Sequence, residues 1–144
     1  MSTLFDLAGR VILVTGASRG IGFAMAETMA QHGATVVLNA RDPDALEAKA
    51  DILRAAGLKA ETAVFDVTDE AASRAAMERI DKDHGRLYGL INNAGVQHRS
   101  PILDFTTADF EHVVSTNLTS CFTNSREAIR LMTTHGGGRI INTV

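Results

Sequence analysis

The sequence has 144 residues but only one cysteine, one tyrosine, two prolines and no tryptophan. A single thiol, Cys121, cannot close a disulfide within the chain, which disfavours a disulfide-stapled secreted fold and favours a reducing compartment. No apolar run approaches the roughly 18–20 residues that a membrane helix needs. Residues 1–6 lack both the basic and the apolar segment of a signal peptide. We therefore expect a cytoplasmic protein.

An excess of positive charge is also missing. Lysine and arginine number 14 against 17 aspartates and glutamates, which gives a formal net charge of −3. A nucleic-acid binder would show a basic patch, and an anionic membrane surface would attract one, so neither partner is expected. The hydrophobic share of 45% and the charged share of 22% are typical of a globular chain. The length predicts one domain, residues 1–144.

Short apolar segments alternate with helical patterns along the chain. Strands are predicted at residues 10–15, 34–38, 60–65, 87–91 and 139–144. Helices are predicted between them, from Ile21 to Gly33, from Asp42-Pro43 to Gly57, from a Thr68 cap to Gly85, and over about 107–132. Apolar strands that alternate with helices are typical of a parallel sheet covered on both faces. We expect a doubly wound α/β fold with five strands.

The sharpest motif is the glycine-rich turn Thr15-Gly16-Ala17-Ser18-Arg19-Gly20-Ile21-Gly22, which follows a predicted strand and opens a predicted helix. Gly16 suits a tight turn, Gly20 lets the backbone approach a pyrophosphate, and Gly22 permits close packing of helix on sheet. A helix N-terminus offers N–H groups and a positive dipole end to such an anion. The alternatives are a turn that only reverses the chain and a nucleoside-triphosphate loop, but the Lys-Ser/Thr pair of that loop is missing.

Three further motifs follow in order: Asp66-Val67 after the third predicted strand, Asn92-Asn93-Ala94-Gly95 after the fourth, and Asn117 in a helix. Together with the glycine-rich turn they resemble the classical short-chain dehydrogenase/reductase family. Residues 38–42 and 95–101 are similar to those of its gluconate 5-dehydrogenase-like members. The resemblance implies a Rossmann-like sheet and a dinucleotide held by Gly16, Ser18, Arg19, Gly20, Ile21, Gly22, Asn39, Arg41, Asp66, Val67, Asn93, Ala94 and Gly95.

The end of the second predicted strand favours NADP over NAD. An NAD site places an acidic residue about 20 positions past the glycines, where it accepts a hydrogen bond from the ribose 2′-hydroxyl. Ala40 stands at that position, and Arg41 follows with a guanidinium that suits a 2′-phosphate. Arg19 adds a second positive charge. The alternative for Arg41 is a solvated side chain paired with Asp42 or Asp44, which does not account for Ala40.

Asn117 lies on a helical stripe with Phe110, Val113 and Cys121, so burial of its side chain is expected. The residues alone favour a core amide that bonds to nearby backbone. The family resemblance implies instead a catalytic role, in which Asn117 holds a water molecule of a proton relay. Cys121 is interpreted as a small core residue rather than a nucleophile.

The loop after the fourth predicted strand leaves alternatives open. Asn92 either contacts the cofactor or ties neighbouring strands together. His98 and Arg99 are either a solvated pair or contacts for an acidic or polyhydroxylated substrate. The histidines show no spacing typical of a metal site, and no metal is expected.

The catalytic residues of the family are not found in the sequence. The resemblance implies a tyrosine as general acid/base, a lysine four residues later and a serine. Tyr88 is the only tyrosine and lies in a predicted strand, and Lys49, Lys59 and Lys82 do not follow it at that spacing. The serine of the family would come just past Val144. We therefore expect an N-terminal, cofactor-binding portion of a longer enzyme that is inactive alone.

The activity that the resemblance implies is hydride transfer between NADP(H) and an alcohol/carbonyl substrate. Similarity to gluconate 5-dehydrogenase-like members favours a sugar acid or polyol. The alternative is a non-catalytic nucleotide-binding or assembly module. Members of the family assemble as dimers or tetramers through a helical region that here includes residues 120–132, so a homo-oligomer is expected at full length.

Overall fold

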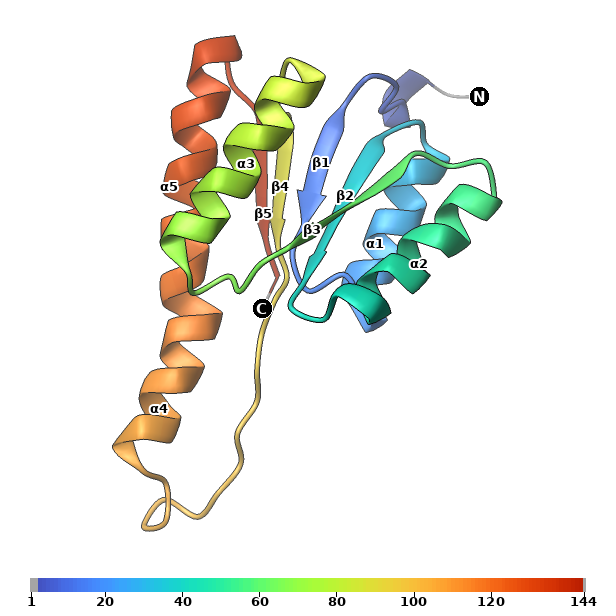
Figure 1. Cartoon of the computed structure of the whole chain (residues 1–144). Coiled ribbons are helices and arrows are strands. Elements are labelled where there is room, and N and C mark those ends of the chain that lie inside the picture. The colour runs from blue at the N-terminus through green and yellow to red at the C-terminus, as the bar shows by residue number, and fades with distance from the viewer. Residues whose placement is uncertain (1–2, 144) are drawn as a thin grey trace.

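Residues 3–143 are described by a computed structural model. Their centre is a parallel sheet of five strands in the order β3-β2-β1-β4-β5 (Figure 1). The strands are β1 Val11–Val14, β2 Thr35–Ala40, β3 Ala60–Val64, β4 Gly89–Asn92 and β5 Arg139–Asn142. The helices are α1 Gly20–Gln31, α2 Pro43–Ala55, α3 Glu70–His84, α4 Thr107–Val114 and α5 Ser120–Met132. The predicted Rossmann-like α/β fold is confirmed.

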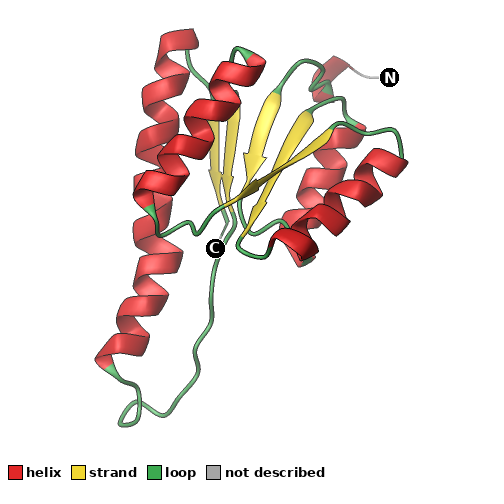
Figure 2. Cartoon of the chain, viewed as in Figure 1, coloured by secondary structure: helices red, strands yellow, loops and turns green. Residues whose placement is uncertain are grey.

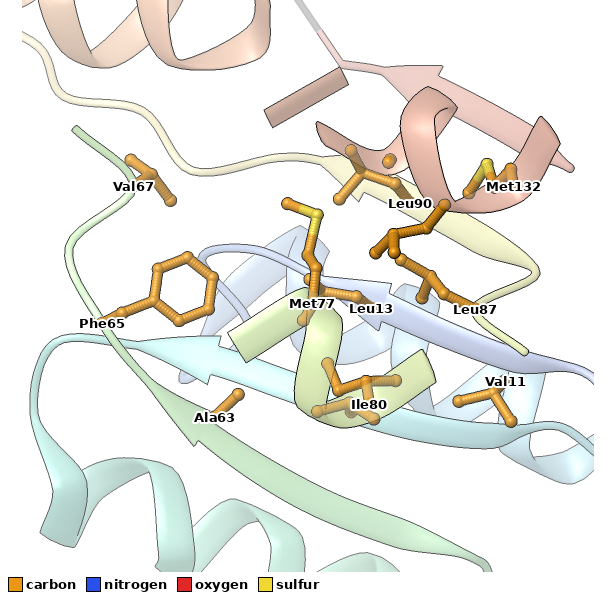
Figure 3. Packing of buried hydrophobic residues seen from close by; sticks show 13 residues of the cluster. Val11, Leu13, Ala63, Phe65, Val67, Met77, Ile80, Leu87, Leu90 and Met132 are labelled. Atoms are coloured by element: carbon orange, nitrogen blue, oxygen red, sulfur yellow. The ribbon is translucent and has the colours of Figure 1, made fainter. Parts of the chain in front are cut away.

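Helices cover both faces of the sheet, α1 and α2 on one face and α3 and α5 on the other (Figure 2). Successive side chains of a strand point to opposite faces, so β1 contributes to two cores. Leu13 packs in the core under α3 and α5, where Figure 3 shows Met77 pointing onto the sheet. Ile12 and Val14 pack in the core under α1 and α2. Burial on both faces explains why the central strands β1, β2 and β4 are nearly all apolar. The outer strands β3 and β5 are partly exposed and carry polar residues.

The strand order places a crevice at one edge of the sheet. From β1 the chain proceeds outward through β2 to β3, then returns to the other side of β1 to form β4 and β5. The helices that follow β1 and β4 therefore cover opposite faces of the sheet. Ligands of open α/β sheets bind at such a reversal, outside the carboxyl ends of the strands. Within residues 3–143, no helix is long and apolar enough to cross a membrane.

Most strand ends differ from the predicted ones by one or two residues. β2 runs to Ala40 rather than ending at Leu38, because Asn39 and Ala40 still pair with β3. β4 begins only at Gly89. The predicted end of the fifth strand, Val144, lies outside the described residues.

The predicted Thr68 cap of the third helix is wrong. The carboxylate of Asp69 caps α3 by accepting from the N–H of Ala72 at 3.0 Å. Thr68 instead donates its N–H and its hydroxyl to the carboxylate of Asp66, at 2.9 and 2.7 Å. Thr68 therefore orders the end of the preceding strand rather than the start of the helix.

A buried carboxylate joins α5 to α3. Glu127 of α5 is only 4% exposed, and its two oxygens accept from Arg74 Nη2 at 2.9 Å and from Arg130 Nε at 3.0 Å. Hydrogen bonds from Arg74, followed by those from Arg130, hold the pKa of Glu127 below its ordinary value despite the opposing effect of burial. Its charge is therefore kept at neutral pH.

Glu127→Gln is expected to lower the free energy of unfolding at neutral pH by about 1–3 kcal/mol, because hydrogen bonds to a buried charge are weakened. Since the folded-state pKa is lowered, this stabilisation is complete above the ordinary glutamate pKa of 4.5 and is lost as the pH falls through the folded value. Urea unfolding of the two proteins should therefore converge in acid. As a control, Glu70→Gln removes the exposed partner of Arg126 and should cost less than about 1 kcal/mol. A loss for Glu127→Gln that did not change with pH would contradict this account.

Candidate functional site

A cleft of about 920 Å³ lies at the carboxyl ends of β1 to β4. Figure 2 shows the strand arrowheads converging at this edge of the sheet. Of the residues predicted to hold a dinucleotide, all but Gly22 line the cleft. The lining also contains residues that the sequence analysis did not assign to the site: Asp42, Ala45, Phe65, Val96 and Thr116.

The glycine-rich turn connects β1 to α1 along one wall of the cleft. Gly16 and Gly20 have φ values of +63° and +56°, in the left-handed region that favours glycine. Arg19 precedes the first helical residue in an extended conformation, and its side chain makes no capping hydrogen bond. The N–H groups at the start of α1 therefore lack a side-chain cap and lie beside the cleft, with the positive end of the helix dipole.

Gly22 lies behind the cleft rather than on its surface. It is buried, and a Cβ atom placed on it would overlap the carbonyl oxygen of Gly16 and the side-chain amide of Asn93. A Cβ on Gly16 would come within 2.8 Å of the Cα of Ala94. The two glycines thus allow the turn, α1 and the segment after β4 to approach one another, as the sequence predicted for Gly22.

Thr15 joins the turn to the segment after β4. Its buried hydroxyl accepts from the N–H groups of Asn93 and Ala94, at 2.9 and 3.0 Å. The side-chain nitrogen of Asn93 donates back to the carbonyls of Thr15 and Gly16, at 3.2 and 3.3 Å. The sequence did not reveal that Thr15 joins these two segments, because a threonine at a strand end is also an ordinary strand residue.

Charged groups gather where β2 and β3 end. The guanidinium of Arg41, whose side chain is 69% exposed, lies 4.0 Å from the carboxylate of Asp66. The backbone and side-chain hydrogen bonds from Thr68 lower the pKa of Asp66, and the positive charge of Arg41 adds to this effect. Asp42 caps α2 by accepting from the N–H groups of Asp44 and Ala45, at 3.0 and 3.2 Å. In contrast to α1, the start of α2 is therefore satisfied within the chain.

Asn117 belongs to a π-helical turn, Ser115–Thr119, that interrupts the predicted long helix between α4 and α5. The expectation that its side chain is buried is wrong, because Thr116 and Ser120 point inward and Asn117 is exposed. A π turn rotates the residues after it relative to an α-helical stripe. The side chain of Asn117 accepts from the N–H of Val96 and donates to its carbonyl, both at 2.8 Å.

A second hollow, of about 940 Å³, continues from the cleft along the segment after β4. The two share six lining residues, and the second adds Gln97, Asn117 and Thr143. His98 lies outside both linings, where its ring is 3.6 Å from the carboxylate of Asp109 and packs edge-on against Phe105.

Asn92 makes the contacts expected of a tie between elements. Its side-chain nitrogen donates to Asn142 of β5 at 2.8 Å and to the hydroxyl of Ser125 in α5 at 3.1 Å. It lines neither hollow. Of its two interpretations, the geometry favours the structural one.

Comparison with known proteins gives consistent matches. A family model described as short chain dehydrogenase matches residues 10–144. The chain is 45% identical over 139 residues to gluconate 5-dehydrogenase of Gluconobacter oxydans (strain 621H), covering 96% of this chain and 54% of that protein. It is 37% identical over 142 residues to 5-keto-D-gluconate 5-reductase of Escherichia coli (strain K12), covering 99% and 56%.

A solved structure agrees with these matches. The crystal structure of a gluconate 5-dehydrogenase from Burkholderia cenocepacia J2315, in complex with NADP and tartrate, superposes with a TM-score of 0.89 at 38% identity. The match covers 96% of this chain and 55% of that one. The chain thus spans about half the length of the relatives it matches.

Gly22→Ala is expected to lower the free energy of unfolding by about 2 kcal/mol, because the new methyl group meets backbone that has no room to move. The loss should occur although alanine favours a helix by up to about 1 kcal/mol over glycine. Gly20→Ala is the matched control: its Cβ meets no atom within 4 Å, so only the left-handed backbone opposes it, at about 1 kcal/mol. Urea unfolding measures both, and a Gly22→Ala protein as stable as the unsubstituted one would disprove the close packing.

Proposed function

Because the chain belongs to the short chain dehydrogenase family, we propose that residues 1–144 form a dinucleotide-binding domain that holds NADP(H). The reaction served is hydride transfer between the nicotinamide and an alcohol/carbonyl pair, and the hydride is what the cofactor supplies. The observation that carries the proposal is the start of α1, which has no side-chain cap and opens into the cleft.

A pyrophosphate fits the glycine-rich wall of the cleft. Backbone N–H groups at a helix start attract an anion, and Gly20 has no side chain to keep it away. Gly16 and Gly22 permit this wall to stand close to Asn93. Residues 16–22 and Asn93 to Gly95 are therefore proposed to hold the central part of the cofactor.

The choice of NADP rests on the charges at the end of β2. Ala40 offers no carboxylate to a ribose 2′-hydroxyl, while Arg41 and Arg19 both line the cleft. A guanidinium binds a phosphate dianion well. Asp66, kept ionised by its lowered pKa, is proposed with Val67 to accept from the adenine amino group.

The second hollow is proposed to receive the substrate beside the nicotinamide. Val96 borders this hollow, and Asn117 holds it there through two hydrogen bonds. We propose that Asn117 supports the proton relay from this position. The names of the relatives support a sugar acid or polyol as the substrate, since two act on gluconate or 5-keto-D-gluconate by name and a third was solved with tartrate.

Assembly into a homo-oligomer is part of the proposal. Several large apolar side chains of the α4–α5 region are exposed, and burying them against a second copy would remove them from water: Phe110, Leu118, Phe122 and Ile129.

The proposal is tested by titrating the purified protein with NADPH and then adding 5-keto-D-gluconate. NADPH binding followed by consumption of NADPH, measured as a fall in its absorbance, supports the oxidoreductase. Binding without consumption of NADPH is the result expected of residues 1–144 alone, because the tyrosine, lysine and serine of the family are not among them. The alternative, a nucleotide-binding module without turnover, is favoured if a protein that also carries those three residues binds NADPH and does not consume it. Absence of NADPH binding would overturn the proposal as a whole.

Arg41→Asp is expected to weaken NADPH binding at least about tenfold, or about 1.4 kcal/mol, and NADH binding far less, because only NADPH carries the 2′-phosphate. Isothermal titration with both nucleotides measures the ratio. Arg79→Asp, which makes the same charge change on α3 away from the cleft, serves as the control and should leave the ratio unchanged. Equal losses for the two nucleotides would refute the assignment of Arg41.

A further inference from the structure

Asn39 is a buried polar residue of the sheet, only 1% exposed. It is the fifth residue of β2 and pairs in register with Ala63 of β3. The last pair of the β2–β3 register is Ala40 with Val64, so Phe65 lies just beyond the regular ladder. Asparagine is disfavoured in strands. Its presence at this place therefore needs a physical reason.

The side chain of Asn39 extends the strand pairing toward the cleft. Its amide nitrogen donates to the carbonyl of Ala63 at 2.9 Å and to the carbonyl of Phe65 at 3.0 Å. An asparagine amide has two N–H donors, and both are used here. The carbonyl of Phe65 belongs to the peptide plane that leads into Asp66, so its hydrogen bond sets the orientation of that plane.

The backbone of Asn39 contacts the opposite wall. Its carbonyl accepts from the N–H of Ala17, in the glycine-rich turn, at 2.8 Å. One residue therefore bonds to the turn through its main chain and to the end of β3 through its side chain. Both partners are followed by residues that line the cleft, Ser18 and Asp66.

We propose that Asn39 is a positioning residue for the adenosine half of the cleft, acting through the Phe65–Asp66 peptide and the glycine-rich turn. This inference rests on the proposed function, since it assumes that a nucleotide lies there. It assigns to Asn39 a role beyond direct contact: the residue lines the cleft, but both donors of its amide are engaged with the chain rather than with a ligand. The donors cannot be supplied by a carboxylate, which only accepts.

Asn39→Asp tests the need for hydrogen-bond donors at this position, because the new carboxyl group donates only at a pH where it is protonated. A protonated carboxyl still donates one hydrogen bond to the strand carbonyls, whereas an ionised one turns negative charge toward both of them. Burial favours the protonated form. The dissociation constant for 2′,5′-ADP, taken as a ratio to the unsubstituted protein at each pH, should be within about threefold at about pH 5 and at least about tenfold worse at about pH 8. The ratio removes the titration of the ligand's own phosphates.

Two controls separate positioning from general damage. Nicotinamide mononucleotide, which lacks the adenosine, should bind the variant and the unsubstituted protein equally. Asn142→Asp makes the same substitution on β5, at a side chain whose oxygen already accepts a hydrogen bond, and should leave both ligands unaffected. A ratio independent of pH, or equal losses for the two ligands, would overturn the inference.

Asn39→Leu provides a readout that needs neither ligand nor pH, because leucine is of similar size and donates nothing. The backbone N–H of Thr68, which is held by Asp66, should exchange with solvent at least about tenfold faster, while that of Met77 in α3 should be unchanged. Unaltered exchange at Thr68 would overturn the inference. Failure of the unsubstituted protein to bind 2′,5′-ADP would instead count against the proposed function. The exchange measurement would still test whether Asn39 positions the Phe65–Asp66 peptide.

Discussion

The close approach of the glycine-rich turn to the segment after β4 is the constraint on which the site depends. Gly16 and Gly22 have no Cβ, so the turn, α1 and Ala94 can lie in direct backbone contact. Thr15 and Asn93 then bond across the junction in both directions. Because β1 and β4 are neighbours in the sheet, these bonds hold two strand ends together at the point where the chain order reverses. The N-terminus of α1 is directed at the cleft as a consequence.

α1 and α2, which both begin at this edge, differ in what satisfies their first N–H groups. α2 is capped by Asp42, and Pro43 removes one of the N–H groups that would need a partner. α1 has an arginine before its first residue and no side-chain cap. Free N–H groups at a helix start are costly unless water or a ligand accepts from them. An anion that accepted from the first N–H groups of α1 would therefore lie beside the residues that the family resemblance assigns to the cofactor.

The sequence predicts the repeating order of strands and helices well, because apolar runs bounded by glycines leave few alternatives. It fails where a side chain decides between two equivalent local solutions. Thr68 and Asp69 are both good cap residues, and only the position of Asp66 determines that the second one caps α3. The end of β2 was missed because Asn39 is a poor strand former whose amide is stabilised by a distant carbonyl. The exposure of Asn117 depends on the one extra residue of a π-helical turn. The spacing of apolar residues in the sequence does not reveal this extra residue.

A hydrogen-bonded backbone and an exposed charged side chain form different parts of the cleft. The turn and the strand ends are held by hydrogen bonds such as Asn93 N–H to Thr15 Oγ1 at 2.9 Å and Ala17 N–H to Asn39 O at 2.8 Å. A backbone held in this way suits recognition of an anion by main-chain N–H groups. Arg41 is largely exposed, and its 4.0 Å contact with Asp66 is of the kind that contributes little in water. A phosphate dianion arriving at this rim would therefore displace a weak pair rather than break a strong one. Had Arg41 been buried against Asp66, its charge would already be neutralised and the same phosphate would gain little from it. The looseness of this pair is thus what leaves the arginine available to a ligand.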